Sequence, residues 1–246
     1  MIKDILKSIR AYFGAFQLIT KLKLWKYFII PMIISVLTAV LIGVLSFSLS
    51  DNIGNYLASF WRWEQGKQTF SVISTFFSGL LIIAIGLLLY KHIIMALSAP
   101  FMSPVSEKIE EFLIGKKEYH QKTTFKEQLI RGVRINVRNL FRELFFTIPI
   151  LLISIIPVIG FFSTFLLFII QSYYAGFGNM DYTLERHFKY KQSINFVKNN
   201  KGLAIGNGII FMLFLLVPII GVVLVLPLSV TAATTETIKN IEQKNI

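Results

Sequence analysis

The chain has 246 residues, of which 54% are hydrophobic and 15% are charged, and its mean hydropathy is +0.65. This composition lies outside the usual range of a soluble globular domain, and the length excludes a membrane domain joined to a separate catalytic domain. The absence of cysteine excludes disulfides, thiolate metal sites and a cysteine nucleophile. We therefore predict one all-α membrane domain over residues 1–246.

The net charge of +12 is compatible with nucleic-acid binding or with membrane topology. The cations gather in residues 1–26, 91–143 and 181–201, whereas the loop over residues 51–67 is balanced. Because positive charge accumulates on the cytoplasmic side of membrane proteins, topology is the simpler explanation. We predict a multi-pass protein of the bacterial inner membrane, with both termini cytoplasmic, residues 51–67 outside and no nucleic-acid partner.

The first half of the chain predicts an interfacial helix followed by two membrane spans. Residues 3–20 are amphipathic. The stretches Tyr27–Ser50 and Gln68–Tyr90 are uncharged and almost 25 residues long. About 20 apolar helical residues cross a hydrocarbon layer of ~30 Å. We place the spans at residues 25–50 and 68–91, and we expect the first to be an anchor rather than a cleaved signal peptide.

Amphipathic helices on the cytoplasmic surface are predicted over residues 101–142. The first of them, Ser103–Ile114, follows Pro100 and ends before Gly115. Its charged residues, Glu107, Lys108, Glu110 and Glu111, are expected to form a solvated face.

A second amphipathic helix carries a stripe of arginines at spacings of three and four. Its members are Arg131, Arg134, Arg138 and Arg142. Such a stripe can bind lipid phosphates in the inner headgroup layer. It can also face a cavity and concentrate small anions as a funnel.

The second half of the chain predicts two re-entrant helical hairpins, over residues 144–180 and 202–238, with the basic segment 186–201 between them. The uncharged stretches Leu144–Met180 and Gly202–Thr235 each carry a Pro-x-x-Gly break. The predicted tips are Pro157 and Gly160 in the first stretch, and Pro218 and Gly221 in the second.

Legs of roughly 14–18 residues, ~21–27 Å long, would enter the membrane only part way. A hairpin also keeps the basic segment cytoplasmic. The alternative is two bent helices without a transport role, although paired interrupted segments are typical of substrate pathways in transporters.

The sequence lacks the patterns of an enzyme. None of the three histidines stands at metal-ligand spacing with another ligand type, and neither a phosphate-binding loop nor a nucleophile motif is present. We predict no catalytic residues, no metal and no cofactor.

The residues resemble the CysZ sulfate permeases, bacterial relatives of the etoposide-induced membrane proteins. The resemblance runs nearly end to end and rests on short motifs in a fixed order: Tyr12–Phe16, Lys26–Pro31, Ser98–Phe101, Glu107, Gly115, Ile156–Gly160, Met180–Tyr182, Val217–Gly221, Pro227 and Ala232–Thr234. It implies two full spans with shorter, partly penetrating helices, a homo-oligomer, and sulfate uptake that feeds cysteine biosynthesis.

The chain departs from the family at the segment before the span-one proline. Members carry Gly-Leu/Ile-Arg-Arg there, a sequence proposed to hold sulfate. Here the matching residues are Lys23, Leu24, Trp25 and Lys26. Lysine lacks the bidentate fork of arginine. By this resemblance Lys23 and Lys26 are the candidate anion-binding residues.

Two functions follow from these observations. The first is a permease or channel for a small inorganic anion, most simply sulfate. The second is a non-transporting membrane scaffold or envelope protein whose basic helices bind anionic lipid or a protein partner.

Overall fold

The computed structural model describes the whole chain except residues 62–64, 116–122, 155, 218–220, 222–223 and 245–246. All regular structure in the described residues is helical. The elements are α1 (Ile2–Lys21), η1 (Leu24–Tyr27), α2 (Ile29–Ala58), α3 (Lys67–Leu97), α4 (Ala99–Ile114), α5 (Phe125–Ile153), α6 (Pro157–His187), α7 (Tyr190–Asn199), α8 (Lys201–Leu215) and α10 (Val225–Lys244).

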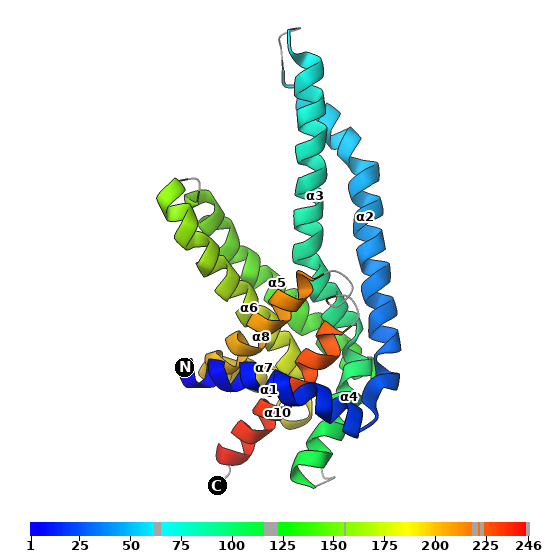
Figure 1. Ribbon diagram of the computed structural model, residues 1–246, viewed down its shortest axis with the longest axis vertical. Coiled ribbons are helices and arrows are strands. Elements are labelled where there is room, and N and C mark those ends of the chain that lie inside the picture. The colour runs from blue at the N-terminus through cyan, green and yellow to red at the C-terminus, as the bar shows by residue number, and fades with distance from the viewer. Residues whose placement is uncertain (62–64, 116–122, 155, 218–220, 222–223, 245–246) are drawn as a thin grey trace.

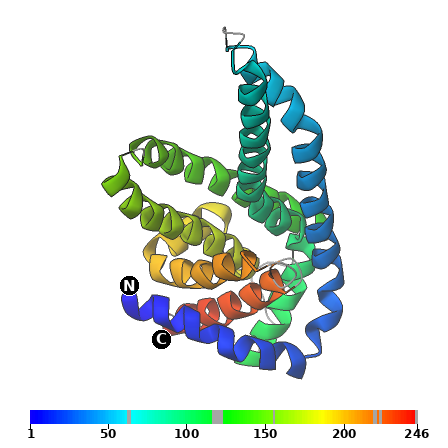
Figure 2. The same cartoon turned by 45° about the horizontal axis from the view of Figure 1, so that its top comes forward.

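Two helical arms rise from a base (Figure 1). The taller arm is the antiparallel pair α2 and α3, and the shorter arm is formed by the far ends of α5 and α6. The base contains α1, α4, α7, α8 and α10 together with the near ends of α5 and α6, and α1 runs across it (Figures 1 and 2). Both termini lie in the base.

The taller arm is held together at small residues. Ser46 Oγ donates to Gly79 O at 3.1 Å, and Ser35 Oγ lies 2.5 Å from Tyr90 Oη. Gly86 lies directly against Ile42. The outward faces carry large exposed apolar side chains, such as Phe47 with 87% of its surface accessible. Small residues at the contact and apolar residues outside are the arrangement expected of helices packed in lipid.

Three helices in the described residues are long and apolar enough to cross a membrane: Leu24–Ala58, Lys67–Leu97 and Ile159–His187. The first two coincide with the predicted spans. The third corresponds to the second leg of the first predicted hairpin together with residues beyond it, and α8 (Lys201–Leu215) is a shorter apolar helix.

The first hairpin differs from its predicted boundaries. The arginine stripe and the first leg form one continuous helix, α5, with no boundary between residues 142 and 144. The partner α6 continues past Met180 to His187. The two helices, of 29 and 31 residues, are therefore longer than the predicted legs of roughly 14–18 residues. The physical reason is that α5 and α6 extend into the base, where ion pairs stabilise buried charged residues. The helices therefore continue beyond the uncharged stretches on which the prediction was based.

The tips of the hairpins depend on close approach rather than on unusual backbone angles. Pro157 begins α6, and the backbone N–H of Gly160 donates to Ile156 O at 2.7 Å. Neither Gly160 nor Gly221 has a positive φ, so neither position requires the left-handed backbone that glycine favours. Instead, a Cβ on Gly160 would lie 2.5 Å from Ser154 O, and one on Gly221 would lie 2.6 Å from Phe214 O. Pro218 lies outside the described residues.

The predicted solvated face of the short helix α4 is also wrong in part. The helix begins at Ala99 and ends at Gly115, which takes a φ of +64°, the left-handed conformation that glycine adopts readily. Glu110 is fully buried against α6, whereas Glu111 and Lys108 stay at the surface. Spacing on one helix showed that the carboxylates share a face, but it contained no information on the partner helix.

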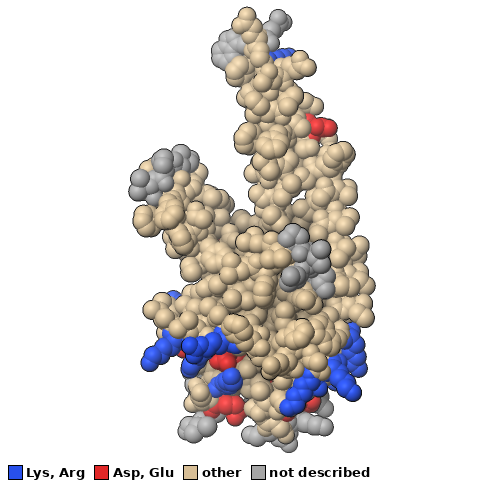
Figure 3. All heavy atoms as spheres, viewed as in Figure 1, with Lys and Arg blue, Asp and Glu red and all other residues tan. Residues whose placement is uncertain are grey.

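Lysines and arginines gather at the base. In the view of Figure 3 they surround its lower part, whereas the arms above are almost entirely uncharged. This separation along the long axis is typical of a membrane protein whose apolar helices lie in the bilayer and whose basic residues lie at one of its surfaces.

Candidate functional site

The turn between α1 and α2 carries the two predicted anion-binding lysines. Lys23 and Lys26 are both exposed, and they flank Leu24, which is fully buried. Lys23 has a φ of +54°, the one positive φ of a non-glycine residue in the described chain. The resembling family has glycine at this position, and the left-handed backbone explains that preference.

A third lysine joins Lys26 across an aromatic ring. Lys26 Nζ lies 5.4 Å from the centre of the Tyr27 ring, and Lys108 Nζ, from α4, lies 5.7 Å from it. Neither lysine forms an ion pair with a described residue. Two cations near one partly buried ring raise the local positive potential, which favours a small anion. We name Lys23, Lys26 and Lys108 the cationic turn.

Sequence reasoning missed Lys108 because the contact is tertiary. On its own helix Lys108 stands among glutamates and has the pattern of a solvated face. No spacing rule connects it to Tyr27, 81 positions earlier in the chain.

The arginine stripe does not form one free surface. Arg131 is mostly buried and donates two parallel hydrogen bonds to Asp181 of α6, from Nε to Oδ2 and from Nη2 to Oδ1, both at 2.9 Å. Its remaining donors reach Phe188 O at 2.9 Å and Ser193 Oγ at 2.6 Å. Every terminus of this guanidinium is engaged, so Arg131 fixes α5 to α6 and α7 and is not available to a funnel.

The other three members of the stripe have different surroundings. Arg134 stacks over Tyr190 with its guanidinium carbon 4.1 Å from the ring centre, and Arg138 lies 5.3 Å from the centre of Phe177. Arg138 also donates to Asn139 Oδ1 at 2.9 Å. Arg142 is exposed. An arginine that lies over an aromatic ring keeps its charge and its outward donors, and Arg142 is exposed. All three residues can therefore still contact anions or lipid phosphates.

A buried ionic cluster joins α4 to α6. Arg186 donates to Glu110 Oε2 through Nε at 3.1 Å and through Nη2 at 2.7 Å, and it donates to Tyr182 O at 2.8 Å. His187 Nε2 lies 2.6 Å from the other oxygen of Glu110. Burial opposes ionisation of Glu110, but the hydrogen bond from His187 and the charge of Arg186 outweigh it, so the pKa of Glu110 is below its ordinary value.

Hydroxyl groups continue this cluster into the base. Ser103 donates to Glu185, and Arg186 Nη2 donates to Ser106 Oγ at 2.8 Å. Ser106 also exchanges hydrogen bonds with Thr183 of α6 and Thr234 of α10. Polar atoms of three helices are thereby satisfied inside the base, and the cluster fixes how these helices are placed relative to one another.

A second buried cluster joins the taller arm to α5. Lys91 Nζ donates to Glu143 Oε1 at 2.7 Å, and His92 Nε2 lies 3.1 Å from Glu143 Oε2. The side chains of Lys91 and Glu143 are 1% and 0% exposed. Within the described residues no group of three or more metal-ligand side chains is arranged to hold a metal ion. Both clusters are buried and join helices to one another, whereas the cationic turn is an accessible charged site.

The comparisons with known proteins agree on one family. The family model described as "Sulfate transporter CysZ/Etoposide-induced protein 2.4" matches residues 11–225. The chain is also similar to a protein of Vibrio atlanticus (strain LGP32) described as "Sulfate transporter CysZ", with 26% identity over 220 residues that cover 85% of this chain and 83% of that protein. The match includes both arms, the cationic turn and both joints, so the chain belongs to the CysZ/etoposide-induced protein 2.4 family of membrane proteins.

Proposed function

We propose that this protein is a permease or channel that carries a small inorganic anion, sulfate, across the bacterial inner membrane to supply cysteine biosynthesis. The observation that supports this most is the cationic turn at the foot of the first span. It offers three lysines without an ion-pair partner among the described residues, in a chain whose family is named for sulfate transport. Family membership favours this function over a non-transporting scaffold.

In this proposal the cationic turn collects the anion on the cytoplasmic side of the membrane, and Arg134, Arg138 and Arg142 add to the positive potential there. The sequence lacks a nucleotide-binding motif, so the proposed flux is passive or driven by a gradient or a partner. A homo-oligomer and cytoplasmic termini are further parts of the proposal.

The direct test is sulfate flux into liposomes that contain the purified full chain. Lys26→Ala removes a charge-assisted contact worth ~1.5–3 kcal/mol, so we expect a roughly ten- to hundredfold loss of apparent affinity. Lys108→Ala is expected to weaken affinity in the same direction, and Lys26→Arg to strengthen it by restoring the fork.

Lys198→Ala is the matched control, because Lys198 is an exposed lysine of α7 with no described partner. Absence of saturable sulfate flux in the unmodified protein would refute the permease. Equal losses of apparent sulfate affinity in Lys26→Ala and Lys198→Ala would show that the cationic turn is not the anion site.

The proposed orientation has its own test. The chain has no cysteine, so single cysteines at Ser59 and Asn199 can be labelled with a membrane-impermeant reagent in intact cells. We expect labelling at position 59 alone. Labelling at 199 alone would invert the orientation, and equal labelling at both would refute the re-entrant hairpins.

A further inference from the structure

Helix α1 has three faces with different surroundings. One face is apolar and exposed, and includes Phe13 with 80% of its surface accessible and Phe16 with 54%. A second face is buried in the base, where Tyr12 Oη lies 2.7 Å from both Asn207 O and Ser229 Oγ. Because residues three and four apart share a face, Asp4, Lys7, Gly14 and Lys21 fall on a third face. This third face is polar and lies on neither the lipid nor the core side.

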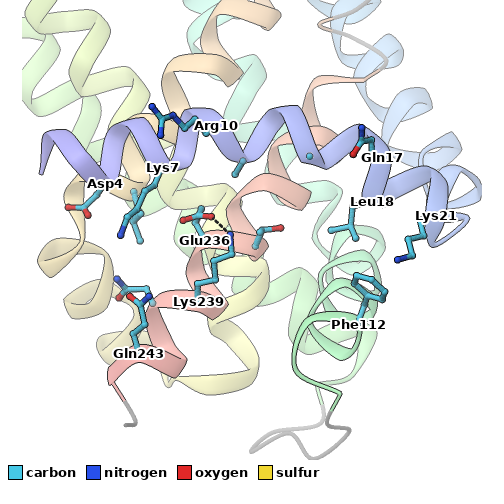
Figure 4. A pocket seen from close by; sticks show the side chains of 15 residues that line it. Asp4, Lys7, Arg10, Gln17, Leu18, Lys21, Phe112, Glu236, Lys239 and Gln243 are labelled. Atoms are coloured by element: carbon cyan, nitrogen blue, oxygen red, sulfur yellow. Dashed lines mark hydrogen bonds and ion pairs between the residues drawn. The ribbon is translucent and has the colours of Figure 1, made fainter.

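The third face borders a groove of about 590 Å³ between α1 and α10. In Figure 4, Asp4 and Lys7 extend from α1 into the groove, and Glu236, Lys239 and Gln243 extend from α10 toward them. Phe112 of α4 lies at one end beneath Lys21, whose Nζ is 4.5 Å from the ring centre. A hollow of this size, lined mostly by polar side chains, is within the range of small-molecule sites.

Cations exceed anions in this groove. Its carboxylates are each already paired, Asp4 with the N-terminal amine at 3.1 Å and Glu236 with Lys239 at 2.7 Å. Among the described residues, Lys7 has no ion-pair or hydrogen-bond partner, and the ammonium of Lys21 lies over the Phe112 ring without an ion-pair partner. An ammonium has three donors, so Lys239 keeps two after it bonds Glu236.

One polar atom beside the groove also lacks a partner. Asn240 contributes to the lining, and its buried Oδ1 makes no hydrogen bond. Ammonium donors without a described hydrogen-bond acceptor, on Lys7 and Lys239 beside one hollow, favour a hydrogen-bond-accepting anion.

We propose that the groove between α1 and α10 binds a phosphate or sulfate group between Lys7 and Lys239. The site is separate from the cationic turn in its residues, and it goes beyond the proposed transport function. The ligand is anchored by Lys7 from α1 and by Lys239 from α10, so its binding stabilises the contact between these two helices.

Two sources can supply the same chemical group. The apolar face of α1 is exposed to lipid, so an anionic phospholipid headgroup can reach the groove from the membrane surface. A soluble phosphate compound can enter it from the water. The probes of the test separate these sources.

The experiment measures binding to the purified full chain in a neutral detergent by titration calorimetry, with inorganic phosphate and dihexanoyl phosphatidylglycerol as the two probes. We expect saturable binding of at least one probe. Lys7→Ala and Lys239→Ala should each weaken it about tenfold or more, the loss of one charge-assisted hydrogen bond. Glu236→Gln should strengthen it, because the substitution removes the repelling carboxylate and releases Lys239.

Lys3→Ala is the matched control, since Lys3 lies on the same helix outside the groove lining and loses the same charge. The thermal midpoint of each variant shows that it folds, and Lys7→Arg should retain binding. The probe that binds identifies the source. The proposal is overturned if neither probe binds, if the Kd of Lys7→Ala and Lys239→Ala equals that of the unmodified chain, or if Lys3→Ala weakens binding as much. These results do not depend on sulfate flux, which Lys26→Ala tests separately.

Discussion

The taller arm and the base achieve their packing by opposite means. In the arm, α2 and α3 meet at Gly54, Gly86 and small hydroxyl residues, and their outer faces are apolar. In the base, helices meet at buried charges, with Glu110, Arg186 and Asp181 each less than 5% exposed. Lipid is as apolar as the helix surfaces, so no hydrophobic force drives the two helices together. The arm therefore depends on close contact between them. The base uses ion pairs and hydrogen bonds, which accept only one arrangement of partners.

The largest expected effect is on the ionic cluster of the base. Arg186→Leu leaves the buried carboxylate of Glu110 without its main partner, which costs about 3–5 kcal/mol of folding stability. We expect loss of folded protein or a large drop in the thermal midpoint in detergent. Phe47→Ala in the arm is the control, because 87% of the Phe47 surface is exposed. An unchanged midpoint in Arg186→Leu would show that the cluster does not hold the base together.

The next effect tests close contact inside the base. A Cβ on Gly176 of α6 would overlap the carbonyl oxygen of Ala204 in α8, whereas a Cβ on Gly43 of α2 would meet nothing within 4 Å. Gly176→Ala should cost about 1–3 kcal/mol or more, since neither backbone can move away easily. Gly43→Ala should be neutral or slightly stabilising, because alanine is the better helix former. Equal midpoints for the two variants would contradict the close crossing of α6 and α8.

The hairpin tips offer a test of intermediate size. In Gly160→Val and Gly221→Val, the new side chain meets a backbone carbonyl oxygen at 2.5 and 2.6 Å. We expect each to destabilise the protein by about 1–3 kcal/mol, which detergent stability and size-exclusion profiles would report. Wild-type behaviour in both variants would favour ordinary bent helices without packed tips.

The smallest effect is a pH dependence that belongs to the base. The pKa of Glu110 is below its ordinary value of 4.5 in the folded protein. The ionised carboxylate therefore contributes stability that is present above that value and is lost as the pH falls through the folded pKa. Unfolding midpoints between pH 7 and pH 3 should fall with acidification, and Glu110→Gln should flatten that decline. A decline of the same slope in Glu110→Gln would assign the acid sensitivity to other groups.

Much of the arm could be predicted from the sequence, whereas the base could not. Long uncharged stretches predicted α2 and α3, because a span of lipid demands continuous apolar residues and nothing else. The same criterion misjudged the first hairpin. It ended the helix at Met180, although α6 continues to His187. In this extension Asp181 pairs with Arg131 of α5, Arg186 pairs with Glu110 of α4, and Glu185 accepts a hydrogen bond from Ser103 of α4.

The candidate sites show the same division. The resemblance to a family pointed to Lys23 and Lys26, but Lys108 entered the cationic turn only through the fold. The arginine stripe was visible in the spacing of its residues. The role of each arginine could not be predicted from that spacing, because Arg131 forms an ion pair with Asp181, which is 50 positions away in the chain.

The sequence by itself determined the class of the protein, the two long spans, the start of α6 at Pro157 and the family, since each depends on hydropathy or on short local motifs. Only the tertiary structure decided which charges are buried, which remain free at the cationic turn, and that α1 and α10 enclose a basic groove. The physical reason is that a helix surface shows which residues share a face, whereas the cost or benefit of a charge depends on the group from another helix that faces it.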